Sequence, residues 1–197
     1  MRPAREYGPD RGPNTVADLD ALPDEGKQYE LAHGWLIQMS PSVQHDETVE
    51  DLREILAPAV PAGFSLRSPY DVRMPDGSIY KPDLAVIDTE AIRTARREDR
   101  RAVSGDDLLL AVEVQRPGSG SRNTVHITKV NDYARAGIPH YWILDLDDVP
   151  VLSVYALREG RVYERIHRAT GDEVAELTEP LAVRFSPASV VTGSLDG

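Results

Sequence analysis

The chain has 197 residues, 41% of them hydrophobic and 28% charged, a composition typical of one globular domain and not of a disordered chain. It contains no cysteine, which excludes disulfides, zinc-thiolate sites and thiol nucleophiles. An apolar run of about 18 residues and an apolar N-terminal signal are both missing from the sequence, so we expect a cytoplasmic protein with no membrane partner. The formal net charge of -11 weighs against tight, non-specific binding of DNA.

The first residues of the chain differ in character from the rest. Residues 1–14 are rich in proline, glycine and arginine and show no apolar periodicity, so we expect a disordered tail. A single domain is predicted for residues 15–190. Its first elements are a short helix, for which Thr15 and Asp18 supply an N-cap pattern, and an N-terminal hairpin within residues 29–37.

The middle of the chain predicts a helix, two strands and a less regular segment. Apolar residues recur at helical spacing over residues 42–60, which predicts the first long helix. Strands are expected at residues 64–74 and 79–87, with the turn Pro75-Asp76-Gly77-Ser78 between them. Residues 88–105 contain five arginines and few apolar side chains, so a loop or a short helix is expected there.

A near-continuous apolar run at residues 108–114 predicts a central strand that is buried on both faces and interrupted only by Glu113. The elements expected after it are a flexible connection at 117–121, a helix at 124–136, a buried strand at 141–146 and a C-terminal hairpin at 151–157 and 162–166. This order predicts an α/β (α+β) fold, with a central mixed β-sheet flanked by helices and an additional hairpin at each end.

Two carboxylates interrupt apolar segments that should form interior strands. These are Asp83, within residues 81–86, and Glu113, within residues 110–115. A buried charge is costly unless it is paired or binds a metal, so two of them on neighbouring strands indicate one site. Oxygen ligands without sulfur or clustered histidines favour Mg²⁺ or Mn²⁺ over zinc. The residues alone leave a structural alternative equally open, namely a buried ion pair or a carboxylate bonded to backbone.

Pro82-Asp83, followed 30 positions later by Glu113-Val114-Gln115, resembles the PD-(D/E)xK signature of restriction-endonuclease-like proteins. Further strings resemble a large bacterial family described as restriction endonucleases, and they occur in the order of that family. These strings are 15–19, 29–34, 39–41 with His45, 81–86, 113–114 with 117–119, and 129–145. The resemblance covers roughly residues 15–160, and its most specific part is KVNDYARAGIPHYWILD at its end.

This resemblance implies a Mg²⁺-dependent phosphodiesterase that acts on DNA, often as a homodimer. In that family pattern, Asp83, Glu113 and the carbonyl of Val114 would hold the metal. Gln115 stands where the signature has its lysine, and on a strand it should face the same side as Glu113. We therefore expect Gln115 to orient the attacking water.

The missing lysine has a counterpart on the following helix in the same family. Lys129, four residues before Tyr133, matches that place and is expected either to stabilise the charge that develops on the phosphate or to position the hydroxide. A solvated helix lysine is the alternative that the residue alone favours. Glu30 matches a family acid and is expected beside the metal, with an exposed strand residue as its alternative.

Two departures from the family pattern keep a second function open. Arg116 stands where a serine is common, and Asn123 where an aspartate is common. The alternative is a catalytically impaired member of the fold that acts as a dimeric DNA-binding or protein-interaction module. A third hypothesis makes the buried acids purely structural.

No DNA-recognition motif is present, so the sequence predicts no substrate specificity.

Overall fold

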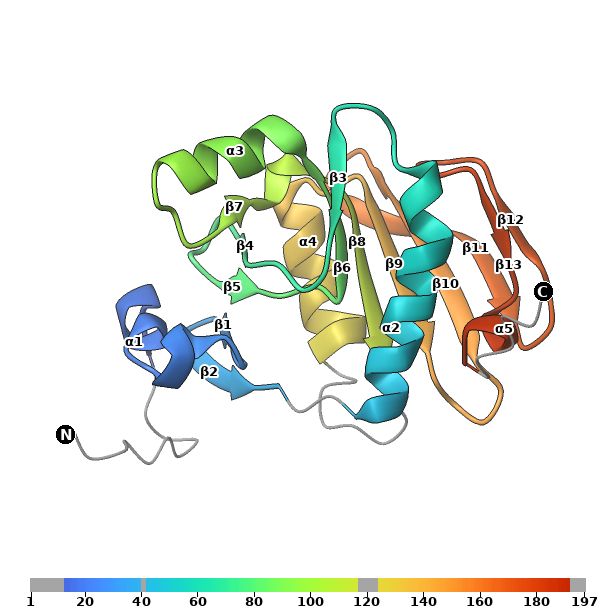
Figure 1. Cartoon of the computed structure of the whole chain (residues 1–197), viewed down its shortest axis with the longest axis horizontal. Helices are drawn as coiled ribbons and strands as arrows, with labels where there is room; N and C mark the ends of the chain where they lie inside the picture. The colour runs from blue at the N-terminus through green and yellow to red at the C-terminus, as the bar shows by residue number, and fades with distance from the viewer. Residues whose placement is uncertain (1–12, 40–41, 117–123, 192–197) are drawn as a thin grey trace.

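The computed structural model describes residues 13–39, 42–116 and 124–191 (Figure 1). The predicted tail, apart from residues 13 and 14, lies outside these ranges. So do the predicted connection at 117–121 and Asn123. No helix within the described ranges is long and apolar enough to cross a membrane.

Five helices and thirteen strands are distributed along the described part of the chain. The helices are α1 (Val16–Asp20), α2 (Val43–Leu56), α3 (Thr89–Arg97), α4 (Val130–Ala136) and α5 (Pro187–Val191), with the 3₁₀ turns η1 (Pro23–Gly26), η2 (Ala57–Ala59) and η3 (Gly105–Asp107) and the π-helical turn η4 (Thr124–Lys129). The strands are β1 (Tyr29–Ala32), β2 (Trp35–Gln38), β3 (Phe64–Arg67), β4 (Val72–Arg73), β5 (Ile79–Tyr80), β6 (Leu84–Asp88), β7 (Val103–Ser104), β8 (Leu108–Gln115), β9 (His140–Asp145), β10 (Val151–Arg158), β11 (Val162–Thr170), β12 (Ala175–Leu177) and β13 (Val183–Phe185).

The central sheet has six strands in the order β11-β10-β9-β8-β6-β3. Only the β8–β9 pair is parallel, whereas the other neighbours are antiparallel, so the sheet is mixed as predicted. The apolar run of β8 and that of β9 lie at its centre, where strands are buried on both faces. The predicted fold class is confirmed.

The two faces of this sheet pack against different helices, because side chains alternate along each strand. One face carries Val112 and Trp142, which pack with Leu52 of α2 and with the small β12–β13 sheet. The other face carries Ala111 and Ile143, which pack with α4. Figure 1 shows α2 in front of the sheet, and α4 contacts the opposite side. The sheet is therefore enclosed by helices, and α4 shares a face with Glu113.

A second sheet, which the sequence did not predict, has five strands in the order β2-β1-β5-β4-β7. It forms because the segments predicted as single strands at 64–74 and 79–87 each divide in two. Pro69 and Pro82 stand at the breaks, and proline supplies no N–H for a strand ladder. Beyond each break the chain passes from one sheet to the other. The second break leaves Asp83 just ahead of β6, where the sequence predicted a strand interior.

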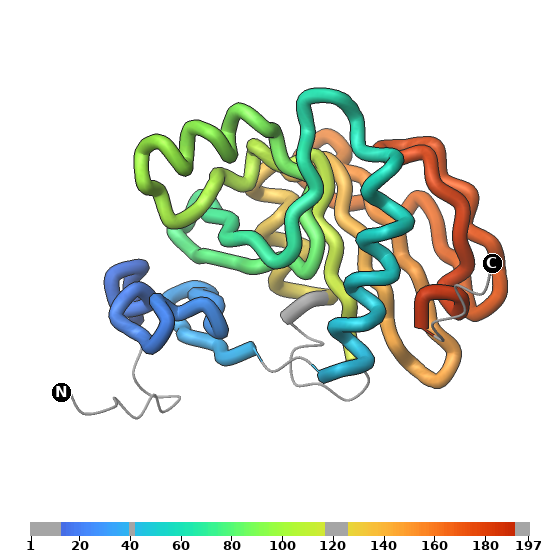
Figure 2. The backbone as a smooth tube through the Cα atoms, in the orientation of Figure 1, coloured from blue at the N-terminus to red at the C-terminus, as the bar shows by residue number. Residues whose placement is uncertain are grey.

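The ends of the described chain lie far apart along the long axis of the molecule. The β1–β2 hairpin and α1 are at one end, and the β12–β13 hairpin with α5 is at the other (Figure 2). Both hairpins predicted from the sequence are present, β1–β2 and β10–β11. After the β10–β11 hairpin the chain continues into β12, β13 and α5.

Helix α4 ends where the sequence predicted. Gly137 adopts a left-handed conformation with φ of 85°, and its N–H donates to the carbonyl of Ala134. A residue without Cβ takes this conformation at no steric cost, which explains why the helix stops there. The preceding turn η4 is wider than an α-helical turn, and Lys129 is its last residue.

The packing of α2 on the sheet yields a stability prediction. Leu52 is fully buried, so Leu52→Ala should lower the free energy of unfolding by about 2–5 kcal/mol through lost burial and the remaining cavity. Val43, on the same helix, is 74% exposed, so Val43→Ala should change the free energy of unfolding by less than about 0.5 kcal/mol. Urea denaturation of both variants checks this. Equal losses in the two would contradict the packing of α2.

Candidate functional site

Asp83 and Glu113 come together where β6 pairs with β8. Leu84 lies opposite Val112 in this antiparallel pair, so one step further along the register Asp83 comes opposite Glu113. The N–H of Val114 donates to Oδ2 of Asp83 at 2.7 Å. The two carboxylates that interrupt the apolar segments are therefore neighbours, as the spacing of the segments indicated.

Glu113 is buried, with 4% of its surface exposed, and its two oxygens differ in their contacts. Oε1 accepts hydrogen bonds from Nζ of Lys129 at 2.8 Å and from the hydroxyl of Tyr133 at 2.9 Å. Within the described ranges, Oε2 has no protein partner. Oε1 of Glu113 is thus bonded to side chains of η4 and α4, and Oε2 is available to a further partner.

Glu30 reaches the same cluster from the N-terminal hairpin. It is 4% exposed on β1, so the alternative of an exposed strand residue is wrong. Its Oε1 accepts from Nζ of Lys129 at 2.9 Å and from the backbone N–H of Lys81 at 2.7 Å. The hairpin thereby places a third carboxylate beside Glu113.

Lys129 lies between these carboxylates with only 4% of its surface exposed, so the alternative of a solvated helix lysine is also wrong. Its ammonium is hydrogen-bonded to both Glu30 and Glu113, and it stands 5.5 Å from the centre of the Tyr80 ring. A ring face at this distance attracts a cation. The wide turn η4 brings the start of α4 close enough to the sheet for these contacts.

The pKa values of two groups in the buried cluster, Lys129 and Glu113, are raised. Burial acts to lower the pKa of Lys129, but the carboxylates of Glu113 and Glu30 outweigh it and raise that pKa above its usual value. Burial raises the pKa of Glu113, and the charges of Asp83 and Glu30 raise it further against the opposing effect of Lys129. Lys129 bonds two carboxylates, Glu30 and Glu113, and Asp83 adds a third negative charge near Glu113. A cation held between Asp83 and Glu113 would lower the repulsion between these two carboxylates.

His45 approaches Asp83 from the first turn of α2. Its Nε2 lies 3.2 Å from Oδ1 of Asp83, and its Nδ1 lies 3.1 Å from Oδ1 of Asp46. Burial acts to lower the pKa of His45, but the hydrogen bonds and charges of Asp83 and Asp46 raise it to about 9. The side-chain oxygen of Ser42 caps α2 and accepts from the His45 N–H, which fixes where the helix begins.

Gln115 is buried on β8, two residues beyond Glu113 and on the same face. Its amide nitrogen donates to the carbonyl of Arg116 at 3.2 Å. It lies opposite Asp145 in the β8–β9 register. Gln115 is therefore at the edge of the cluster, beside Glu113 but not bonded to Lys129.

The donor set fits a hard divalent cation such as Mg²⁺ or Mn²⁺. In the described part of the chain, no three histidine, aspartate and glutamate side chains are grouped as a ready-made metal cage. Mg²⁺ does not need such a cage, because it keeps several waters and commonly uses one or two carboxylates. Asp83, the second oxygen of Glu113 and the carbonyl of Val114 offer oxygen atoms of the type that Mg²⁺ binds.

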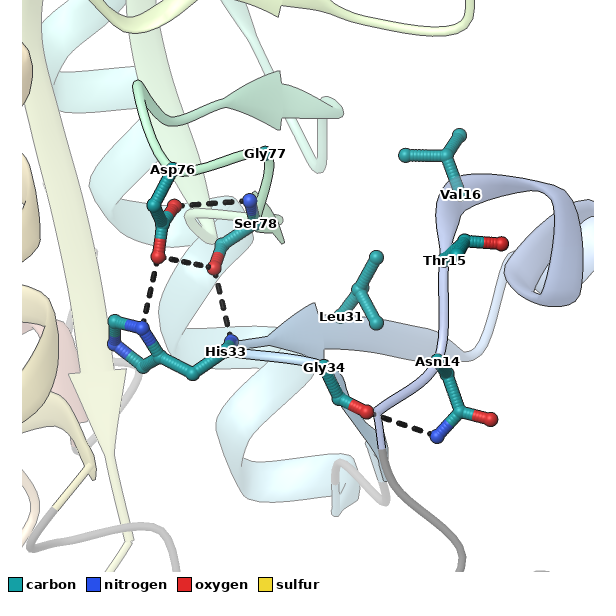
Figure 3. Close-up of a pocket in the computed structure, with 9 residues that line it drawn as sticks. All are labelled: Asn14, Thr15, Val16, Leu31, His33, Gly34, Asp76, Gly77 and Ser78. Atoms are coloured by element: carbon teal, nitrogen blue, oxygen red, sulfur yellow. Dashed lines mark hydrogen bonds and ion pairs between the residues drawn. The ribbon is translucent and has the colours of Figure 1, made fainter.

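A cavity of about 290 Å³ lies apart from the cluster, between the N-terminal segment and the turn at residues 76–78 (Figure 3). His33 lines it and lies 2.8 Å from Asp76 through Nδ1. The other ring nitrogen, Nε2, lies 2.8 Å from Asp132 of α4, which also accepts from the hydroxyl of Tyr80 at 2.7 Å. This network ties the hairpin that carries Glu30 to the helix that carries Lys129.

Sequence reasoning assigned no role to some residues that hold the cluster together. The hydroxyl of Tyr133 bonds Glu113, and its position four residues after Lys129, on the same helix face, was an available signal. Tyr80 and the backbone of Lys81 carried no such signal, because they reach the site through the unpredicted second sheet.

The chain is similar to known proteins in sequence family and in fold. Residues 16–190 match the Uma2 family, described as "Putative restriction endonuclease". A solved structure of a "putative nuclease" from Anabaena variabilis ATCC 29413 superposes with a TM-score of 0.64 and covers 91% of this chain and 98% of its own, at 16% identity. At that identity the likeness concerns the fold alone, and no curated protein sequence matches the chain significantly. Because the family match spans most of its length, the chain belongs to the Uma2 family and has the restriction-endonuclease-like fold.

Proposed function

We propose that this protein is a divalent-metal-dependent endonuclease that hydrolyses phosphodiester bonds of DNA. Membership of a family described as restriction endonucleases supports a nuclease. The observation that carries the finer proposal is the meeting of Asp83 and Glu113 beside the buried ammonium of Lys129. Two carboxylates that can hold a divalent ion, beside one buried ammonium, suit metal-assisted phosphodiester hydrolysis.

Asp83, Glu113 and the carbonyl of Val114 would hold Mg²⁺, or Mn²⁺ in its place. When bound, the ion would supply positive charge at the scissile phosphate and acidify a water molecule. The contacts of Asp83 favour this assignment, because the Val114 N–H and His45 hold its carboxylate in one orientation. Preorganised ligands bind with less loss of conformational freedom.

Lys129 would act on the charge that develops during attack. Its ammonium has three N–H donors, of which two engage Glu113 and Glu30, and we assign the third to a phosphate oxygen. Glu30 would then be a positioning residue that holds the lysine. A buried donor of this kind is effective because little water competes with it.

Gln115 would orient the attacking water. Its amide nitrogen donates to the Arg116 carbonyl, and its side chain leaves β8 on the same face as Glu113. The water would attack in line with the phosphorus–oxygen bond that breaks, and the 3′-oxygen would leave. We further expect a homodimer, an expectation that rests on the family resemblance, and we retain the cytoplasmic location predicted from the sequence.

The central test removes one carboxylate of the proposed metal site. Asp83→Asn should reduce Mn²⁺-dependent cleavage of labelled single-stranded, duplex and branched DNA by at least about 10³-fold, since an amide is a poor ligand for a hard cation. Glu176→Gln, on the exposed side of β12, serves as the control and should cleave like the wild type.

Two outcomes would contradict the proposal. Undiminished cleavage by folded Asp83→Asn would exclude Asp83 as a ligand. A folded wild type that cleaves none of the three substrates would favour the impaired binding module instead.

Lys129 should matter for both stability and cleavage. Lys129→Met leaves two buried carboxylates without their cation, so the free energy of unfolding without metal should fall by about 3–5 kcal/mol. Cleavage should fall by about 10²–10³-fold, the usual cost of losing one such donor. Urea denaturation and single-turnover assays measure the two effects, and Lys27→Met, at an exposed lysine, is the control. An unchanged denaturation midpoint would contradict the buried ion pair, and unchanged cleavage would contradict the catalytic role.

A further inference from the structure

A second acid–base pair lies close to the candidate site and has no role in the proposal above. His126 of η4 points its Nε2 at Oδ1 of Asp145, the last residue of β9, at 2.8 Å. The side chain of Asp145 is 9% exposed, and that of His126 is 27% exposed. The carboxylate is thus nearly buried, whereas the imidazole remains accessible.

The strand register sets the pair beside the candidate metal centre. Asp145 lies opposite Gln115 in the parallel β8–β9 pair, so the two side chains leave the sheet on the same face. Glu113 stands two residues earlier on β8, about 6–7 Å back along that face. The pair is therefore at the same end of the same two strands as Glu113 and Gln115.

The turn η4 connects His126 to Lys129. Both belong to this one wide turn, yet Lys129 bonds a carboxylate on β8 and His126 a carboxylate on β9. η4 is a π-helical turn. Such turns are rare and often occur at functional sites. Here the turn presents a lysine and a histidine, side by side, to adjacent strand ends.

The contact with Asp145 determines which nitrogen of His126 can react. An ionised carboxylate only accepts hydrogen bonds, so it holds the proton of a neutral imidazole on Nε2 and leaves the lone pair on Nδ1. Within the described residues Nδ1 has no partner. A carboxylate in this position also stabilises the imidazolium that forms when Nδ1 takes a proton.

The other groups of the cluster are poor proton acceptors. Lys129 acts as a donor here, because its ammonium donates hydrogen bonds to both Glu113 and Glu30. Glu30 and Glu113 each accept a hydrogen bond from that ammonium with one carboxylate oxygen. The side-chain amide of Gln115 does not take up a proton. Hydrolysis needs an acceptor for a proton of the attacking water, and His126 is suited to that role.

We propose that His126, oriented by Asp145, is the general base of the phosphodiester hydrolysis, an inference that rests on the proposed function. Nδ1 takes one proton from the water, and the electron pair of that O–H bond forms the new bond to phosphorus. The bond between phosphorus and the 3′-oxygen breaks, and the leaving oxygen keeps its electron pair and takes a proton from solvent. The imidazolium then returns its proton to solvent.

The test compares His126→Gln, Asp145→Asn and the double variant with wild type, using labelled single-stranded and duplex DNA and Mn²⁺ under single-turnover conditions. His126→Gln should lower the rate by about 10²–10⁴-fold, with melting temperature and Mn²⁺ affinity unchanged. Asp145 is a positioning residue, so the double variant should be no slower than His126→Gln alone. The control is His167→Gln, a histidine of β11, which should retain the wild-type rate.

A DNA substrate with sulfur in place of the bridging 3′-oxygen distinguishes a general-base role of His126 from a general-acid role. Its leaving group is a thiolate, which leaves without protonation and so needs no general acid. The His126→Gln defect should persist on it, and a defect that disappears would make His126 the acid for the leaving group and overturn the proposal. Wild-type rates in folded His126→Gln would overturn this inference while leaving the nuclease intact. Absence of cleavage by the wild type would overturn the proposed function, and this inference with it.

Discussion

The ammonium of Lys129, buried between Glu30 and Glu113, is the interaction on which the rest of the site depends. An unpaired buried charge costs several kcal/mol, so each of the three side chains needs the other two. They come from a hairpin, a central strand and a helix that are far apart in sequence. Their contact therefore links the two sheets and α4, and a displacement of any one element would leave a charge without its partner.

The same cluster explains how one arrangement can serve both stability and chemistry. Lys129 bonds the carboxylates of Glu30 and Glu113, and the imidazole of His45 faces the carboxylate of Asp83. Within the described residues, Oε2 of Glu113 remains available to a further cation. The protein as a whole is acidic, with a formal net charge of -11, so its attraction for DNA must come from local groups. A divalent ion at Asp83 and Glu113 would provide such a charge where the phosphate has to lie.

The sequence predicted the central sheet and the two carboxylates because both have local signals. Apolar runs interrupted by one acid mark Asp83 and Glu113, and helical spacing marks α2 and α4. The second sheet had no such signal, because it depends on pairing between distant residues such as Leu31 and Ile79. For the same reason the burial of Glu30 and Lys129 could not be derived from their local segments. Family resemblance singled both out, without indicating that they would bond each other.

The central claim is that Asp83 and Glu113 hold a divalent metal, and anomalous scattering from a crystal soaked in Mn²⁺ tests it most directly. We predict one strong peak between the carboxylates of Asp83 and Glu113, within about 2.0–2.3 Å of oxygen ligands and beside the carbonyl of Val114. The claim would be contradicted by a crystal soaked at saturating Mn²⁺ that shows no anomalous peak there while Lys129 remains bonded to Glu30 and Glu113.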